Sequence, residues 1–345
     1  MIRLKKIPAI SVIIPMYNAE KYIGECLAGI LAQTFQDFEV IVVNDCSTDS
    51  SVAVVEGYKK FFGERLKIAR TKKNSGNPGV PSNMGIRFSR GEYLLILDND
   101  DAITPTALEE LYTTAKKFDA DVVACEKYFT VPDELWNKNF LTQILAENQK
   151  NISAHEAILI SEDISERLAQ CMSGKNLWPL WAKLIRRDAL TENHIQLVDS
   201  VIQDLLATLC LLLTVKKYVC VSNVVNFYRV RKSSLYHQKY TPQNYFRKYF
   251  RSLRVGFDYF DKFLGEREFF RQHSDLKYKI LSLYFDASSD YLEKIYGDVS
   301  IYELDEILRE EFGNGDNRAL SAFIFNISHL YRLQLKNLQP RIEQE

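Results

Sequence analysis

The sequence lacks several features that mark common functional classes. It contains no run of about 18 apolar residues, so we expect no transmembrane helix. Its 44 basic and 45 acidic residues give a net charge of −1, which argues against a nucleic-acid-binding protein that relies on bulk positive charge. It has neither a GxGxxG motif nor a P-loop, which argues against a dinucleotide oxidoreductase or an ATPase. We therefore expect no nucleic-acid partner.

Paired cysteines and a secretory leader are also missing. The six cysteines stand singly and form no CxxC pair, so buried thiols in a reducing cytosol are favoured over a zinc site. The apolar run near the N-terminus ends at Pro15, which is typical of a strand rather than of a signal peptide. We expect a cytoplasmic protein, with peripheral contact at the inner face of the membrane as an open alternative.

The sequence does contain a regular alternation of strand-like and helix-like segments over its first 126 residues. Short apolar runs alternate with amphipathic stretches, which is typical of parallel strands buried on both faces between helices. The expected strands are 10–14, 38–43, 66–69, 93–97 and 121–125. We predict an α/β fold with a Rossmann-like, mostly parallel sheet flanked by helices.

The later part of the chain no longer shows this regular alternation and becomes mainly helical in pattern. Residues 154–172 have helical spacing, and 199–215 read as a strongly apolar helix that contains Asp204. After residue 238 the sequence reads as several helices rich in Tyr, Phe, Lys and Arg. We therefore predict two domains, an α/β domain at 1–238 and a helical C-terminal domain at 239–345.

Polar residues follow three of the expected strands at the point where each strand ends. These segments are 15–18, 44–49 and 98–101, and they should meet at one edge of the sheet, where ligands of such folds bind. Asp98 and Asp100 are two residues apart, so they point the same way in extended chain and suit a Mg²⁺ ion that substrate phosphates also bind. The alternative is that these acids, Asp101 above all, cap the helix expected to open at Thr104.

Two loops add candidate ligand contacts at the same edge. Tyr17 offers an aromatic ring that could stack on a base or sugar, and Asn18 offers an amide. Residues 74–79 and 81–85 form a glycine-bearing segment that leads into a helix, which can bring backbone N–H groups close to a phosphate.

Three motifs in this order resemble a known family. VIIPMYN (12–18), VVNDCSTDS (42–50) and YLLILDNDD (93–101) are similar to motifs of the nucleotide-sugar-dependent glycosyltransferases of family 2, which have the GT-A fold. The resemblance covers about residues 9–237 and is strongest over the first 126. It implies a GT-A domain followed by a helical extension.

The resemblance also implies roles for individual residues around a UDP-sugar donor. Asp45 would accept a hydrogen bond from uracil, and Asp98 would lie near the ribose. Asp100, with His237, would ligate Mg²⁺ or Mn²⁺. The remaining donor contacts would be Pro15, Tyr17, Asn18, Asn74, Gly76, Asn83, Asn99, Arg229, Arg231 and Ser234. Ser82 stands where the family often has an arginine.

Two further positions match the family on the acceptor side. Asp204 matches the general base, although Gln203 stands where the family usually has Glu. Trp181 matches an element near the acceptor. From the residues alone, Asp204 could instead lie on an exposed helix face, Trp181 could be a core residue, and the segment that contains Arg229 and Arg231 could be a solvated basic loop.

The segment 245–260 has aromatic residues at helical spacing and basic residues between them. Such a helix could lie on an anionic membrane, where lipid-linked acceptors reside. The favoured alternative is that it packs on the catalytic domain or on a second subunit, which would make a homo-oligomer.

Together these features predict an inverting, metal-assisted glycosyltransferase of polysaccharide biosynthesis. It would move a sugar from a UDP-sugar to a hydroxyl of a glycan or lipid-linked acceptor. The rival hypotheses are a non-catalytic nucleotide-sugar-binding subunit and a Mg²⁺-dependent phosphatase. The phosphatase is disfavoured because its DxD motif belongs on the first strand, whereas here the motif follows the fourth.

Overall fold

The computed structural model of the protein describes residues 6–151, 157–172, 179–200, 202–231, 241–277, 279–281, 284 and 300–313. The chain divides into two compact units, one made of residues 1–197 and 207–238 and the other of 198–206 and 239–345. The second unit thus includes a short segment from within the predicted first domain. The predicted boundary near 238 stays a proposal.

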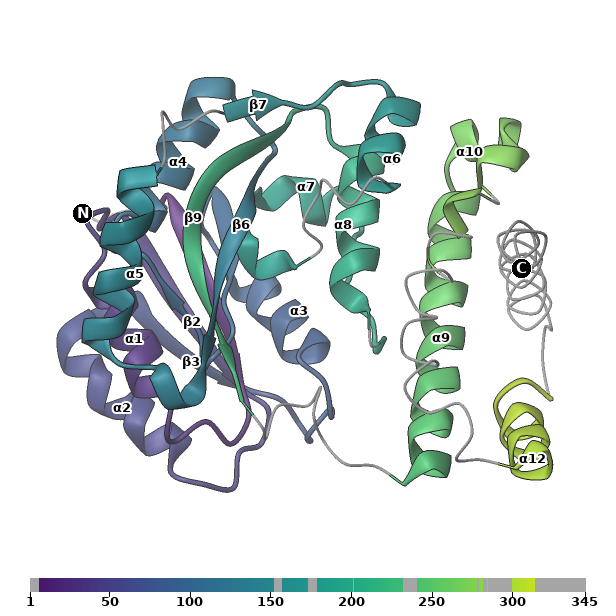
Figure 1. Ribbon diagram of the computed structural model, residues 1–345, viewed down its shortest axis with the longest axis horizontal. Coiled ribbons are helices and arrows are strands. Elements are labelled where there is room, and N and C mark those ends of the chain that lie inside the picture. Colours follow the sequence, from purple (N-terminus) through teal and green to yellow (C-terminus); the bar gives the residue numbers. More distant parts are fainter. Residues whose placement is uncertain are drawn as a thin grey trace, which may run out of the picture. The chain divides into compact units, whose positions relative to one another are not determined.

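The first half of the sheet forms as the alternating pattern predicts. Its strands lie in the order β3–β2–β1–β4 and pair in parallel (Figure 1). Their bounds are β1 Ile10–Met16, β2 Phe38–Asn44, β3 Leu66–Arg70 and β4 Tyr93–Ile96. Every residue of β1 and β2 is buried, which explains why both read as continuous apolar runs.

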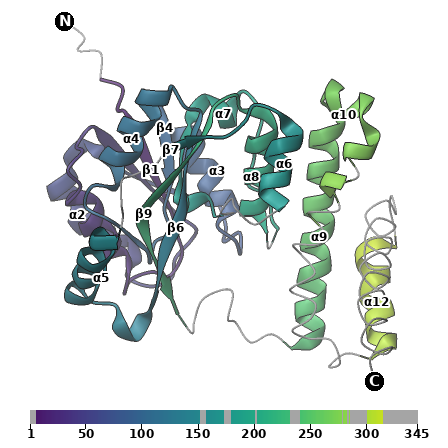
Figure 2. The same ribbon diagram turned by 45° about the horizontal axis from the view of Figure 1, so that its top comes forward.

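Helices cover both faces of this sheet (Figures 1 and 2). The helices are α1 Ile23–Leu31, α2 Ser51–Phe62, α3 Gly79–Phe88 and α4 Ala107–Phe118. Alternate residues of a strand face opposite sides, and Ile10, Val12 and Ile14 share one core cluster with α1, α2 and α4. Ile13 faces α3, and a Cβ added at Gly85 of α3 would lie 2.3 Å from its Cγ2.

Beyond β4 the sheet becomes mixed. β8 pairs antiparallel with β4 on one side and with β6 on the other, and β9 pairs with β6 in parallel and with β5 and β7 antiparallel. The bounds are β5 Ala102–Ile103, β6 Val122–Pro132, β7 Ala157–Leu159, β8 Lys183–Arg186 and β9 Tyr218–Val230. The α/β sheet with flanking helices is confirmed, but it is mixed rather than mostly parallel: β1 to β4 pair in parallel, as do β6 and β9, and the other described pairings are antiparallel.

The remaining helices of the described chain come after α4 in the sequence. They are α5 Lys138–Asn151, α6 Ile164–Met172, α7 Arg187–Thr191, α8 Gln203–Thr214, α9 Pro242–Gly265, α10 Glu268–Gln272 and α12 Ile301–Phe312. The single helix that spacing predicted over 154–172 is wrong, because 157–159 pair with β9 as β7 and only α6 is helical. Among the described residues no helix is both long and apolar enough to span a bilayer.

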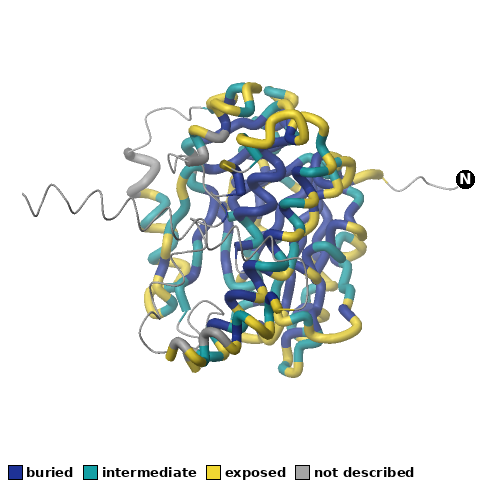
Figure 3. Tube along the Cα trace, turned by 90° about the vertical axis from the view of Figure 1, so that its right-hand side faces the viewer, coloured by how far each residue is buried: buried dark blue, intermediate teal, exposed yellow. Residues whose placement is uncertain are grey.

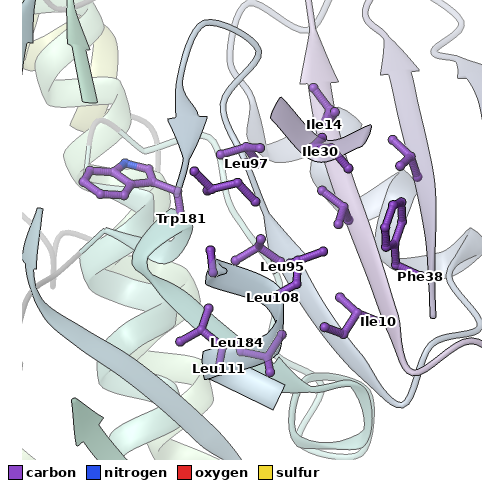
Figure 4. Packing of buried hydrophobic residues seen from close by; sticks show 14 of the residues in the cluster. Ile10, Ile14, Ile30, Phe38, Leu95, Leu97, Leu108, Leu111, Trp181 and Leu184 are labelled. Carbon is purple, nitrogen blue, oxygen red and sulfur yellow. The ribbon is translucent and has the colours of Figure 1, made fainter. Parts of the chain in front are cut away.

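The core of the first unit lies between the sheet and its helices. In Figure 3 the buried residues gather along the strands, and exposed residues gather on the loops and outer helix faces. Figure 4 shows Leu95 and Leu97 of the β4 segment against Leu108 and Leu111 of α4, with Trp181 at the margin of the cluster. This rigid core fixes where the ends of β1, β2 and β4 lie.

The second unit buries the aromatic side of α9. Phe246, Phe250 and Phe257 are all buried, and the ring of Phe250 meets that of Phe312 in α12 edge-on at 6.1 Å. The basic side chains of α9 face acids of α12, with Arg247 Nε 2.8 Å from Glu310 Oε2. These contacts lie within the second unit, an arrangement that the sequence alternatives did not name, and they occupy aromatic and basic side chains of α9 that a membrane would contact.

Candidate active site

Two acids lie in the turn that follows β4 and differ in their surroundings. The N–H of Asp101 donates to the main-chain carbonyl of Asp98 at 3.2 Å, which closes a tight turn. The side chain of Asp100 is 13% exposed, and its Oδ2 lies 2.5 Å from Nε of Arg231, which follows β9. The guanidinium of Arg231 also lies over the ring of Tyr22, 4.5 Å from its centre. The proposed metal ligand is therefore paired with an arginine.

Asp101 is a buried acid with one partner. It is 1% exposed, its Oδ1 accepts the N–H of Arg229 at 2.9 Å, and its Oδ2 has no hydrogen-bond partner within the described structure. Burial, reinforced by the charges of Asp98 and Asp100, raises its pKa well above the ordinary range. The expected capping role is wrong, because α4 begins after Thr106 with no side-chain cap, and Asp101 instead joins the DxD turn to β9.

Asp45 follows β2 and lies in a socket of hydrogen-bond donors. The hydroxyl of Thr71 donates to its Oδ1 at 2.7 Å, and the N–H and hydroxyl of Ser75 both donate to its Oδ2 at 2.8 Å. The residue is buried. These donors fix the direction of the carboxylate, and both Thr71 and Ser75 come from the segment after β3. Sequence reasoning assigned no role to Thr71 or Ser75, although Ser75 lies within the 74–79 loop that it singled out and Thr71 lies three residues before that loop.

The loop after β1 meets the loop after β2. The N–H of Asn18 donates to Ser47 Oγ at 3.0 Å, and Asn18 Oδ1 accepts the N–H of Thr48 at 2.8 Å. Asn18 has a φ of +46°, in the left-handed region where asparagine is well tolerated. Its amide carbonyl therefore holds the loops together, whereas the Tyr17 ring is 46% exposed at their rim.

The loop after β3 is shaped by its asparagines. Asn74 Oδ1 accepts the N–H of Gly76 at 2.7 Å, and Asn77 Oδ1 accepts that of Gly79 at 2.8 Å. Gly76 has a φ of +77°, which a residue with a side chain rarely adopts. The turn delivers Ser75 to Asp45 and then leads directly into α3.

Three residues that the resemblance placed at the donor instead hold protein segments together. Asn83 donates to the carbonyl of Leu197 at 2.7 Å and accepts its N–H at 3.0 Å, so both ends of its amide are occupied. Asn99 donates to the carbonyl of Pro15 at 2.9 Å, which ties the DxD turn to β1 and also occupies the oxygen of Pro15. These bonds give Asn83 and Asn99 a positioning role in the donor-free protein, and their contact with the donor stays a prediction.

Arg229 is the third of these residues. It is 5% exposed, and its guanidinium pairs with Glu25 of α1 and with Asp133, 3.5 Å away. Its guanidinium carbon lies 3.9 Å from the ring centre of Trp136 and 5.0 Å from that of Tyr22. In the donor-free protein this arginine is caged by two carboxylates and two rings, and its expected contact with a diphosphate stays a prediction.

An aromatic cluster borders the acids. Trp181 is buried and stacks on Tyr228, with ring centres 5.6 Å apart and planes at 6°, while Tyr128 meets Trp181 edge-on at 4.8 Å. Burial raises the pKa of Tyr228 to about 12, and the charges of Asp101, Asp98 and Asp100 add to the effect. Tyr228 therefore lies in the field of the acids. Sequence reasoning assigned Tyr228 no role beyond its place before Arg229.

The candidate base lies in the other unit. Asp204 is half-buried in the first turn of α8, within the segment 198–206. Its neighbour Gln203 has a buried side-chain oxygen with no hydrogen-bond partner in the described part of the chain. Ser234 and His237 lie outside the described residues.

The acids suit a divalent ion that a ligand helps to bind. Within the described ranges no three His, Cys, Asp or Glu side chains form a group that could hold a metal by themselves. Asp98 and Asp100 still supply the carboxylate oxygens that Mg²⁺ and Mn²⁺ prefer, and an ion of this kind usually keeps waters and substrate phosphates as its other ligands. The donor set fits a metal that arrives with a diphosphate.

Comparisons with known proteins agree on one family. Residues 11–165 match the model of glycosyl transferase family 2. A poly(ribitol-phosphate) beta-glucosyltransferase of Bacillus spizizenii is 44% identical over 115 residues, which are 33% of this chain and 18% of that protein. The uncharacterized glycosyltransferase EpsJ of Bacillus subtilis is 30% identical over 184 residues, 53% of this chain and 49% of that protein. The chain thus spans half or less of the length of these relatives.

A solved structure is similar over nearly the whole chain. The S. aureus TarS fragment 1–349 in complex with UDP-GlcNAc has a TM-score of 0.63, with 94% of this chain and 92% of that chain covered. The two are 21% identical, so this likeness shows the fold. A full-length TarS sequence of Staphylococcus aureus, a poly(ribitol-phosphate) beta-N-acetylglucosaminyltransferase, is 40% identical over 115 residues, 33% of this chain and 20% of that protein.

Proposed function

Because residues 11–165 match the model of glycosyl transferase family 2, we propose that the chain is a member of this family and an inverting enzyme that moves a sugar from a UDP-sugar to an acceptor hydroxyl. The observation that carries the proposal is the position of Asp45 and of the Asp98–Asp100 turn. They follow β2 and β4, which flank β1 in the parallel part of the sheet. Ligands of open α/β sheets bind beyond these strand ends.

The socket around Asp45 supports a role in base recognition. An ionised carboxylate offers about four lone-pair directions, and Thr71 and Ser75 use three of them. The remaining direction is on Oδ1, the oxygen that accepts only the Thr71 hydroxyl. It would accept an N–H of the uracil ring, and the exposed ring of Tyr17 would stack against the nucleoside.

Asp98 and Asp100 would hold the metal that accompanies the donor. A bound Mg²⁺ or Mn²⁺ ion would neutralise charge on the departing UDP diphosphate. Arg231 and the backbone of the 74–79 loop would contact the phosphates, because a guanidinium fork and backbone N–H groups both suit phosphate oxygens.

Asp204 would act as the general base. Its carboxylate would take the proton of the acceptor hydroxyl while that oxygen attacks the anomeric carbon. The bond from that carbon to the UDP oxygen would break, and UDP would leave with the electron pair. Attack from the face opposite to UDP inverts the anomeric configuration. Trp181, stacked on Tyr228, would border the acceptor.

The names of the relatives narrow the substrate classes. Two act on poly(ribitol phosphate), and the similar solved structure holds UDP-GlcNAc. We carry over UDP-glucose and UDP-GlcNAc as first donors to test, and a hydroxyl-rich glycan or polyol phosphate as acceptor. Work on polysaccharide or teichoic-acid-like polymers on the cytoplasmic side of the membrane is part of the same proposal.

The first test is UDP release from a panel of UDP-sugars with Mn²⁺, with and without an acceptor polymer. We expect acceptor-dependent UDP release by the wild type. In Asp204→Asn it should fall by about 10³-fold or more, with UDP affinity retained. Asp188→Asn is the matched control, because Asp188 is also an acid in the first turn of a short helix. A wild-type rate in Asp204→Asn would remove the base assignment.

The non-catalytic binding subunit stays the second candidate because of two departures from the family. Gln203 replaces an acid, and Ser82 replaces an arginine with a side chain whose buried Oγ has no hydrogen-bond partner among the described residues. A wild-type protein that binds UDP-sugar but releases no UDP with any donor and acceptor pair would favour this candidate.

A further inference from the structure

The pairing of Arg231 with Asp100 places a cation where the proposed metal would bind. Nε of Arg231 lies 2.5 Å from Asp100 Oδ2, and the two side chains are 19% and 13% exposed. The ring of Tyr22, 4.5 Å from the guanidinium carbon, supports the other side of the arginine. A mostly buried ion pair with an aromatic support is a defined arrangement and not a transient surface contact.

Arg229, near the end of β9 and two residues before Arg231, provides a contrast. Both arginines use the ring of Tyr22, yet Arg229 has its own carboxylates in Glu25 and Asp133. Arg231 pairs with an acid of the DxD motif instead. Of the two arginines, Arg231 is thus the one whose partner is also a candidate metal ligand.

A divalent ion and a guanidinium cannot both stay close to one small carboxylate at low cost. Positive charges a few ångströms apart repel strongly at a site that is largely shielded from water. When a metal binds Asp100, Arg231 must therefore move or lose its ion pair. A diphosphate that arrives with the metal offers the displaced arginine a new partner, since its planar fork of donors matches phosphate oxygens.

We propose that Arg231 holds the cation position at Asp100 in the donor-free protein and transfers to the diphosphate when metal and nucleotide bind. It is a positioning residue that makes metal and nucleotide binding cooperative. The inference rests on the proposed function for the identity of the nucleotide. It adds that metal alone binds weakly because Arg231 competes with it, and that nucleotide relieves this competition.

The test measures Mn²⁺ binding by electron paramagnetic resonance, without and with UDP, in wild type, Arg231→Gln and Arg231→Lys. Without UDP, we expect Arg231→Gln to bind Mn²⁺ roughly tenfold more tightly than wild type. The factor by which UDP strengthens Mn²⁺ binding should fall by a similar amount in this variant. Arg231→Lys, which keeps the charge but loses the fork, should lie between the two.

Two controls separate competition from a general effect of charge. Arg70→Gln removes an exposed arginine at the end of β3 and should leave Mn²⁺ binding unchanged. Adding Asp100→Asn to Arg231→Gln should cancel the gain, since the two changes act on one ion pair. Thermal unfolding of each variant checks that it is folded.

The role of Arg231 and the proposed function can fail independently, because different measurements test them. Equal or weaker Mn²⁺ binding in Arg231→Gln overturns it, and so does an equal gain in Arg70→Gln or a wild type that binds no Mn²⁺ even with UDP. UDP release from UDP-sugars is measured separately and decides the proposed function. If the wild type turns over UDP-sugar but UDP does not strengthen its Mn²⁺ binding, the proposed enzymatic function stands and the transfer of Arg231 from Asp100 to the diphosphate is rejected.

Discussion

Replacing Arg229 by methionine tests whether this arginine binds the donor or supports the fold. The sequence resemblance assigns it to the diphosphate, whereas the structure cages it between Glu25, Asp133 and the rings of Trp136 and Tyr22. Methionine keeps much of the apolar stem and removes the charged head. If Arg229 binds the donor, this change should weaken UDP binding and leave stability nearly unchanged. If Arg229 supports the fold, the change should lower stability and leave UDP binding nearly unchanged.

The expected loss of stability in Arg229→Met depends on which partners of the arginine are buried. Arg229 is 5% exposed, but Glu25 and Asp133 are 59% and 41% exposed and can be rehydrated when the arginine is removed. The loss is therefore mainly the cation–π contacts, about 0.5–2 kcal/mol each, and the charge-assisted hydrogen bonds, about 1.5–3 kcal/mol. The methionine side chain avoids the cost of burying a charged guanidinium, and this offsets part of the loss. We expect a net loss of about 2 kcal/mol of unfolding free energy.

Thermal unfolding and UDP titration calorimetry together measure both responses. A loss of about 2 kcal/mol should lower Tm by roughly 3–4 °C, while the Kd for UDP changes by less than about threefold. Glu25→Gln is the matched control and should cost less than Arg229→Met, because Asp133 and the rings still hold the guanidinium. A Kd that weakens by thirtyfold or more at unchanged Tm would refute the structural role and restore the arginine to the donor site.

Three more expectations concern packing and charge. Gly85→Ala should cost about 1–3 kcal/mol in urea denaturation, because its Cβ would meet Ile13 Cγ2 at 2.3 Å, whereas Gly57→Ala, with open space in α2, should stabilise by about 0.5–1 kcal/mol; equal effects would contradict the close packing of α3 on β1. Burial of Glu39 opposes ionisation, but its hydrogen bonds and the nearby lysine outweigh burial and lower its pKa below the ordinary 4.5. The stability that ionised Glu39 contributes is therefore present above pH 4.5 and lost as pH falls through its lower folded-state pKa. The free energy of unfolding should therefore fall less steeply between pH 5 and 3 in Glu39→Gln than in wild type. The pKa of Asp101 is raised, so its effect on stability has the opposite pH dependence: the stability that its protonated form allows is lost as pH rises. Asp101→Asn should therefore gain stability relative to wild type between pH 5 and 8. A loss of stability at pH 8 would show that the charged form is needed.

The strands around the site could be predicted because their signal is local. β1, β2 and β4 are short apolar runs that end in polar residues, so sequence spacing alone indicates where Asp45, Asp98 and Asp100 emerge. The strand order β3–β2–β1–β4 was not predicted, because consecutive strands usually lie side by side and β4 lies beside β1 rather than β3. β8 could not be placed in this way, because its antiparallel pairing between β4 and β6 depends on segments far away in sequence.

The partners of individual side chains could not be predicted for the same reason. Asn83 bonds to a residue 114 positions away, and Arg229 to one 204 positions away. A motif specifies which residue occurs, and the tertiary structure decides whether its polar atoms face a ligand or another segment. The sequence therefore located the edge of the sheet but could not separate residues that contact a ligand from those that hold the loops.

The charge at this edge has a consequence for how a donor can approach. Three aspartates in four positions repel one another and would also repel a diphosphate. The donor-free protein relieves this repulsion with its own groups, because burial favours the protonated form of Asp101 and Arg231 pairs with Asp100. A nucleotide diphosphate that arrived without a metal would draw Arg231 away and leave Asp100 uncompensated. Under the proposed function, metal and nucleotide should therefore bind together, and nucleotide affinity without metal should depend on Arg231 more strongly than affinity with it.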